Sequence, residues 1–107
     1  MKVYIKSKKI NTNAVAEYDI KTKKCIVCKG SVVSEKISDS ETFRAKNTIK
    51  EYRDKFVENG IVKNDVVFKS ASTAANFVTG SSTNGLVTWK DKNGRNIKKL
   101  LEDRIDE

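Results

Sequence analysis

Residues 68–90 (FKSASTAANFVTGSSTNGLVTWK) constrain the fold of this chain more than any other stretch. Ser70 can act as an N-cap, because its hydroxyl can accept from N–H groups that the first helical turn leaves unpaired. Gly80 can adopt the left-handed conformation that ends a helix, and apolar side chains between the two fall on one helical face. Asn84-Gly85 favours a tight turn. The stretch therefore predicts a strand ending at residue 68, a helix, and a second strand over residues 86–90.

The first third of the chain alternates apolar and polar residues, which is typical of half-buried strands. Val3 and Ile5 mark a first strand, residues 14–20 a second, and residues 25–28 a third. Residues 21–23 are few enough to turn the chain back on itself, so these segments predict a three-stranded antiparallel meander. Residues 66–68 predict a further strand that leads into the helix after Ser70.

Two more helices are predicted around these elements. Ser40 is a candidate N-cap for a helix over residues 41–58, and Asn59-Gly60 is a good stop for it. After a turn over residues 91–94, apolar residues at helical spacing predict a short C-terminal helix: Ile97, Leu100, Leu101 and Ile105. For 107 residues we expect one α+β domain, with an antiparallel sheet made of the meander and two later strands, two main helices and the short C-terminal helix.

Positive charge concentrates in the meander. The net charge of the chain is +8, and residues 1–36 carry nine lysines against three acidic residues, whereas residues 37–60 and 91–107 are each neutral. Clustered lysines are typical of surfaces that bind polyanions, because phosphates need cations and release condensed counterions on binding. Lysines on strands and turns also keep exposed sheets from pairing with one another, which is the alternative interpretation. The predicted nucleic-acid-binding residues are Lys6, Lys8, Lys9, Lys21, Lys23, Lys24, Lys29 and Lys90.

Other bulk features limit the class of partner. The sequence has no apolar run of membrane-spanning length and no secretory signal, so we expect a cytoplasmic protein without membrane contact. Arginine occurs only four times, which disfavours bidentate readout of bases. If the partner is DNA, we therefore expect contacts to its backbone.

The residue types that usually carry catalysis are few. Cys25 and Cys28 lie three positions apart in a predicted strand, so they point to opposite faces and cannot form a disulfide with each other. The chain has no histidine, which excludes four-ligand zinc sites of the usual kind for a monomer, and both thiols are expected to be structural. The acidic residues do not converge as a metal-dependent nuclease requires. We expect no enzymatic activity, no cofactor and no metal.

Ten residues within the stretch over 68–90 form a spaced pattern: Phe68, Ser70, Ser72, Ala74, Ala75, Gly80, Asn84, Gly85, Trp89 and Lys90. The pattern resembles the module catalogued as domain of unknown function 4357. The run CIVCKGS over residues 25–31 is similar to the lead-in strand of that module, and the two runs together span most of residues 24–101. The chain departs from the family at Ala71, where proline is usual, and at Leu86, where an aromatic residue is common. By this resemblance, residues 61–101 form a strand-helix-strand module that follows the basic meander (1–36) and the helix (37–60).

The resemblance implies partners. That family is typically appended to GIY-YIG-type nucleases and restriction-modification proteins, and it is similar to a module associated with adenine methylases that is thought to bind DNA. We therefore expect a non-catalytic accessory module that binds nucleic acid backbones. The alternative is a protein interaction or dimerisation module, whose partner would be a second copy of the chain or a parent nuclease or methylase.

Two features of the stretch over 68–90 allow either a binding role or a structural one. The polar rim made of Ser70, Ser72, Asn84 and Gly85 could receive a phosphate at the helix N-terminus, or it could serve capping and turns. Trp89 could stack on an unpaired base, or it could belong to the core. In either case Lys90 is predicted to project from the opposite face of its strand, where it could meet a phosphate.

Overall fold

The computed structural model describes residues 1–105 and is built on a four-stranded antiparallel sheet; residues 106 and 107 and the side chain of Ile105 lie outside the described part. β1 (Lys2–Ser7), β2 (Thr12–Tyr18) and β3 (Cys25–Val27) are consecutive, and β6 (Val66–Phe68) adds to β3, giving the order β1-β2-β3-β6. Burial alternates along these strands, so one face of the sheet is directed to the core. The predicted meander and the predicted strand over residues 66–68 are confirmed.

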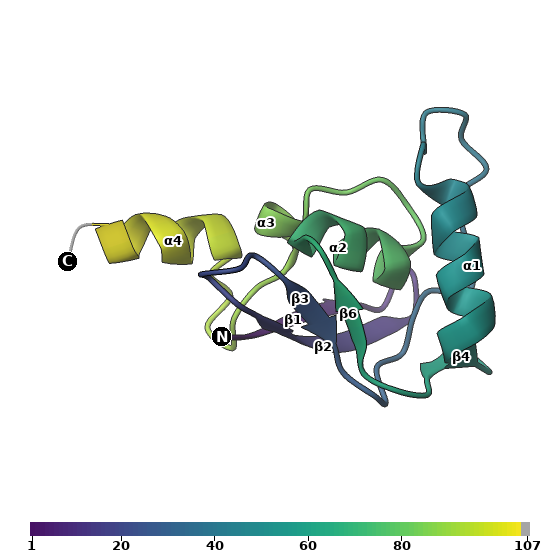
Figure 1. Cartoon of the computed structure of the whole chain (residues 1–107), viewed down its shortest axis with the longest axis horizontal. Coiled ribbons are helices and arrows are strands. Elements are labelled where there is room, and N and C mark those ends of the chain that lie inside the picture. The colour runs from purple at the N-terminus through teal and green to yellow at the C-terminus, as the bar shows by residue number, and fades with distance from the viewer. Residues whose placement is uncertain (106–107) are drawn as a thin grey trace.

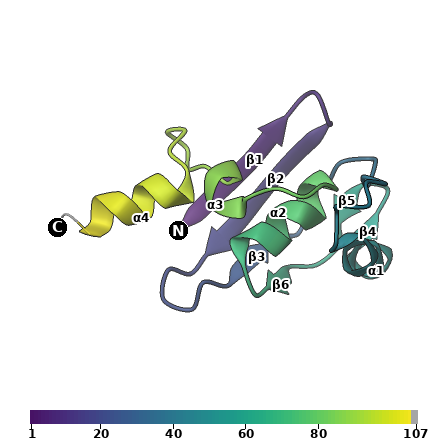
Figure 2. The same cartoon turned by 90° about the horizontal axis from the view of Figure 1, so that it is seen from above.

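Helices lie on one face and at the ends of this sheet (Figures 1 and 2). α2 (Ala71–Thr79) covers the buried face, and α1 (Lys46–Phe56) packs beside it at one end. α3 (Gly85–Thr88) is a short helix next to α2, and α4 (Ile97–Ile105) projects away from the body. A hairpin of β4 (Val57–Glu58) and β5 (Ile61–Val62) follows α1. The predicted α+β class and C-terminal helix are confirmed.

α2 has the cap and the stop that its sequence predicts. The Ser70 hydroxyl accepts the N–H of Thr73 at 3.1 Å, and Gly80 ends the helix in the left-handed region with φ of 72°. A Cβ at Gly80 would also overlap the carbonyl of Lys36, so glycine is required there on two counts. The small side chains on the inner face let the helix backbone approach β2 and β3 closely. The residues that make this face are Ala71, Ala74, Ala75 and Val78, all buried.

The predicted strand over residues 86–90 is wrong, because residues 85–88 form α3. Asn84 acts as an N-cap whose side-chain oxygen accepts the N–H of Leu86 at 3.0 Å, and its φ of −85° is not that of a hairpin turn. The hydroxyl of Ser72 accepts the N–H of Gly85 at 2.9 Å and draws this turn onto α2. Only Lys90 pairs with the sheet, through a single bridge to Tyr4.

The predicted helix over residues 41–58 begins and ends elsewhere. α1 starts at Lys46, and the hydroxyl of Ser40 pairs with the hydroxyl of Thr42 at 2.7 Å instead of capping it. The helix ends at Phe56, because the chain passes directly into β4. The Asn59-Gly60 pair therefore turns a hairpin instead of stopping a helix, with φ of 53° and 77°.

The first turn of α2 holds the segment that follows α3. The indole N–H of Trp89 donates to the carbonyl oxygen of Ala71 at 3.0 Å, and the Trp89 side chain is fully buried. The backbone of Gly85 lies so close that an added Cβ would overlap the carbonyl of Ala71 and the nitrogen of Ser72. Trp89 is therefore a core residue, and its position fixes Lys90 against the outer edge of β1.

The last turn of α2 is closed by an arginine from α1. The guanidinium of Arg53 donates to the carbonyls of Phe77 (2.9 Å), Val78 (3.3 Å) and Ser34 (2.7 Å), and to the Ser34 hydroxyl (2.9 Å). The final carbonyls of a helix lack partners within the helix, and a cation there is favoured by the helix dipole. Burial lowers the pKa of Arg53 to about 10, so the side chain remains charged at neutral pH.

Replacing Arg53 with alanine should destabilise the protein strongly, because it removes the donor from the carbonyls of Phe77 and Ser34. We expect the free energy of unfolding to fall by about 3 kcal/mol in urea denaturation. The control is Arg44→Ala, which removes the same charge from an exposed position and should change stability by less than about 0.5 kcal/mol. Equal losses for the two variants would contradict the assigned role.

Replacing Gly85 with alanine distinguishes packing from helix propensity. Propensity alone predicts that Gly85→Ala stabilises a helix by about 1 kcal/mol. The overlap with the backbone of Ala71 and Ser72 predicts instead a loss of about 3 kcal/mol or more. Gly94→Ala is the comparison, because Gly94 has open space around it and φ of 81°, so its cost should be only the left-handed strain of about 1–2 kcal/mol. A thermal melt in which Gly85→Ala is the more stable of the two would refute this packing.

Candidate functional site

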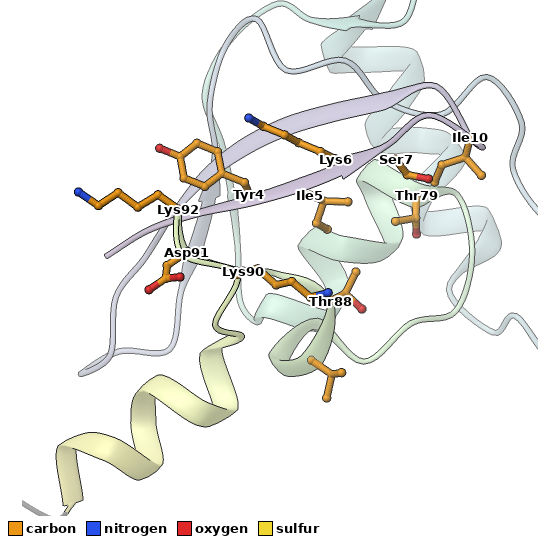
Figure 3. Close-up of a pocket in the computed structure, with 12 residues that line it drawn as sticks. Tyr4, Ile5, Lys6, Ser7, Ile10, Thr79, Thr88, Lys90, Asp91 and Lys92 are labelled. Carbon is orange, nitrogen blue, oxygen red and sulfur yellow. The ribbon is translucent and has the colours of Figure 1, made fainter.

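A groove of about 790 Å³ runs along the outer edge of β1 (Figure 3). One wall is β1 with the turn that follows it, and the other is α3 with the turn over residues 91–94. Three lysines take part in its lining, together with one acidic residue. The lining residues are Tyr4, Ile5, Lys6, Ser7, Ile10, Thr79, Val87, Thr88, Lys90, Asp91, Lys92 and Gly94.

Backbone pairing at one point creates the groove. The N–H of Tyr4 donates to the Lys90 carbonyl at 2.7 Å, and the N–H of Lys90 donates to the Tyr4 carbonyl at 3.0 Å. On the other side of this segment, the N–H of Ile97 donates to the Trp89 carbonyl at 3.3 Å. Alternate residues of a strand direct their backbone groups to the same edge, so the N–H and C=O of Lys6 also face the groove.

The acidic residue of the groove is already neutralised. The carboxylate of Asp91 accepts the backbone N–H groups of Arg95 and Asn93, both at 2.9 Å, and pairs with the Arg95 guanidinium at 3.1 Å. The backbone N–H of Arg95 is the main donor that holds the pKa of Asp91 below its usual value. This carboxylate shapes the turn over residues 91–94 and contributes little negative charge to the groove.

The lysines of the groove have no acidic partner. Within residues 1–105 the ion pairs are Met1 with Glu17, Arg95 with Asp91, and Lys99 with Asp103, and none involves Lys6, Lys90 or Lys92. All three lysines are exposed. They come from opposite ends of the sequence, so the fold and not local sequence brings them together. The arrangement can therefore bind an anion without first breaking an internal ion pair.

Side-chain directions divide the groove into two parts (Figure 3). Lys90 runs toward Thr88, on the side of β1 that holds Ile5. Tyr4 and Lys6 point to the other side of β1, and the Lys6 ammonium lies 5.3 Å from the centre of the Tyr4 ring. This separation is within the range of a cation–π contact. A bound polyanion could thus follow the edge of the sheet from one side to the other.

The structure gathers only some of the lysines predicted to bind nucleic acid. Lys6 and Lys90 line the groove, and Lys8 and Lys9 belong to the turn that contributes Ile10 to it. Another set lies at the opposite end of the hairpin, about 20 Å away along a strand of seven residues: Lys21, Lys23 and Lys24. Lys29 is at a third place, where its N–H donates to the Asp65 carboxylate at 2.7 Å.

The polar rim predicted around the N-terminus of α2 is engaged in internal hydrogen bonds. Ser70 caps α2, Ser72 accepts from Gly85, and Asn84 caps α3. Gly85 itself is buried against Ala71. These contacts position the groove by fixing α3, so the rim supports the site without lining it.

Sequence reasoning missed Lys92 and Thr88. Lys92 lies in a segment whose net charge is zero, so a count by segment gave no reason to select it. Its place in the groove depends on the turn that Asp91 and Arg95 hold. Thr88 was assigned to a strand that does not form. The only available signal was the turn motif over residues 91–94, which located the turn but not its neighbours.

Neither cysteine has the environment of a reactive thiol. Both are free; Cys25 is buried, and desolvation raises its pKa to about 12. Cys28 is half-buried, and desolvation raises its pKa as well. Thiols of this kind stay protonated at neutral pH and are poor nucleophiles and metal ligands. In the part of the chain that the structure describes, no three cysteine or acidic side chains lie close enough to hold a metal ion.

Comparison with known proteins assigns the chain to a family. Within residues 1–105, no helix has both the length and the apolar composition that crossing a bilayer requires. No match was found among curated proteins or among solved structures. The model of one family, described as a domain of unknown function (DUF4357), matches residues 4–101, which include the whole groove and all of the sheet except the first two residues of β1. The protein belongs to this family.

Proposed function

We propose that this protein is a non-catalytic accessory module that binds the phosphate backbone of nucleic acid along the groove beside β1. The observation that carries the proposal is that Lys6, Lys90 and Lys92 all line this groove, exposed and without acidic partners among the described residues. Lys8 and Lys9 extend the same positive surface around the β1–β2 turn. Lysine suits backbone contacts because its ammonium is a compact charge that meets a phosphate from many directions.

The energetics of such binding follow from the charge. Each lysine that neutralises a phosphate releases condensed counterions, so affinity falls steeply as salt rises. We expect a surface of five lysines to bind nucleic acid measurably at low salt. Few arginines are available for reading base edges, and Arg53 is taken up by the core, so we propose binding with little sequence preference.

The cellular role that we propose follows from the family resemblance. The resemblance implies that modules of this kind are appended to GIY-YIG-type nucleases and restriction-modification proteins and are similar to a module associated with adenine methylases. The protein would serve such an enzyme by holding its substrate in place. We propose no catalysis by the module itself, because the chain has no histidine and both thiols have raised pKa values. DNA and a parent nuclease or methylase are therefore the partners that we infer.

A second candidate is a dimerisation module, which is favoured by the outer strand of the sheet. β6 lies at the end of the strand order, and Val67 on it is 54% exposed. An outer strand with an exposed apolar side chain is a common place for a second copy to add. Size-exclusion chromatography separates the candidates, because this role requires a dimer in the absence of nucleic acid.

Neutralising the groove lysines should weaken binding to every oligonucleotide alike. In a variant with Lys6→Gln, Lys90→Gln and Lys92→Gln, we expect affinity for a short duplex to fall about tenfold or more at low salt. The slope of log affinity against log salt should become shallower by about 2–3 for the duplex and about 2 for a single strand. Fluorescence anisotropy across a salt series measures both quantities.

The matched control removes the same charge from the opposite end of the hairpin. The variant with Lys21→Gln, Lys23→Gln and Lys24→Gln should keep most of the affinity and most of the salt slope. If the control triple loses as much affinity as the groove triple, binding depends on net charge and not on the groove. If the parent protein binds no oligonucleotide at 50 mM salt, the proposed function is wrong.

A further inference from the structure

No helix among residues 1–105 lies over the face of the sheet opposite α2 (Figures 1 and 2). Its side chains are those that alternate with the core residues along β1, β2, β3 and β6. Tyr4 lies opposite Val15, Glu17 opposite Ile26, and Ile26 opposite Val67. The partly or fully exposed apolar members form a band across the four strands, which we call the open face: Tyr4, Val15, Ile26, Cys28 and Val67.

Cations border the open face. Lys2 and Lys6 lie on it in β1, and Lys6 contacts the Tyr4 ring. Lys92 lines the groove with Tyr4 at the outer edge. Of the acidic residues at this face, Glu17 lies 3.5 Å from the N-terminal ammonium of Met1, and Asp65, next to Cys28, accepts the N–H of Lys29 at 2.7 Å. An aromatic ring and an apolar band thus stand next to unpaired lysines.

We propose that the open face binds single-stranded nucleic acid, with a base stacked on Tyr4 and the adjoining phosphates on Lys6 and Lys92. This inference rests on the proposed function and specifies its substrate. Base stacking on an aromatic ring suits any sequence, because every base has a π-face. A flat antiparallel sheet with an exposed aromatic residue is a platform of the kind that single strands use.

A duplex fits the open face less well. It presents phosphates and sugars on its outside and keeps the base faces stacked within, so Val15, Ile26 and Val67 would meet only polar groups. Unpaired bases can instead cover these apolar side chains and remove them from water. The helix that forms one wall of the groove, α3, has only four residues, which is too short to act as a recognition helix in a major groove.

A second copy of the chain is a poorer occupant than a single strand. A two-fold contact places the same patch on both subunits, so it would bring together two faces that Lys2 and Lys6 border. Among the described residues, two acidic side chains lie at this face and both have partners: Glu17 pairs with Met1, and Asp65, beside Cys28, accepts the N–H of Lys29. Like charges opposed in this way are destabilising, whereas phosphates are complementary to them.

Substitutions at Tyr4 test the inference in the full chain. Anisotropy with a labelled oligothymidine and with a duplex of the same length should show tighter binding of the single strand. Tyr4→Leu should weaken oligothymidine binding by about 5- to 100-fold while leaving duplex binding nearly unchanged. Tyr4→Phe keeps the ring and should retain the affinity of the parent. Thermal melts check that both variants fold, as expected for a half-buried side chain outside the core.

A second measurement uses the parent protein and tests the inference even if Tyr4→Leu fails to fold. In NMR titration of the parent with oligothymidine, the methyl signals of Val15, Ile26 and Val67 should shift, and those of the exposed Ile61 in β5, which does not line the groove, should move less. Equal or tighter binding of the duplex, or full affinity in folded Tyr4→Leu, would overturn the inference and leave the proposed function standing. Binding of neither oligonucleotide overturns both. Dimerisation without any oligonucleotide, with methyl shifts that depend on protein concentration, would assign the open face to a second copy.

Discussion

The carbonyl oxygen of Ala71, in the first turn of α2, receives the indole N–H of Trp89, and the groove depends on this contact. Trp89 fills the core between α2 and the segment after α3, where its burial removes a large apolar surface from water. Gly85 makes room for the approach, because any side chain there would overlap the same turn of α2. With Trp89 anchored, the next residue, Lys90, has its backbone placed within hydrogen-bonding distance of Tyr4. One buried hydrogen bond and one glycine thus connect the core to the outer edge of the sheet.

This connection explains why the spaced pattern over residues 68–90 of this chain combines serine, glycine, asparagine and tryptophan. Ser70 begins α2, Ser72 holds the N–H of Gly85, and Asn84 begins α3. These residues are scattered in sequence but touch one another around a single turn of helix. They cap the helices and allow close packing, and together they fix the position of Lys90. The groove is then lined mostly by side chains outside this pattern, on β1 and the turn over residues 91–94.

Sequence patterns predicted the elements whose signals are local. The meander follows from alternation in β1 and β2, and α2 follows from Ser70 and Gly80 at its two ends. The Asn84-Gly85 pair led to the wrong prediction of a turn into a strand, because the same dipeptide suits a hairpin turn and a helix start. The helix start is favoured by the hydroxyl of Ser72, which accepts the N–H of Gly85 and is distant in sequence. The grouping of the lysines in space was also not predictable from the sequence. Their number was clear from the sequence, but strand length separated Lys21, Lys23 and Lys24 from the groove, and the turn held by Asp91 and Arg95 brought Lys92 into it.

The fold therefore joins a rigid core to a charged edge through Trp89, and the function that we propose requires this edge to stay in place. Hydrogen exchange measured by NMR on the Trp89 indole N–H and on the amides of Tyr4 and Lys90 tests the connection directly. If the Ala71 contact holds the edge, all three protons should be strongly protected and should exchange at similar rates, because one opening event exposes them. Exchange of the indole and Lys90 protons at the rate of unstructured peptides, while the amides of β2 stay protected, would contradict the account.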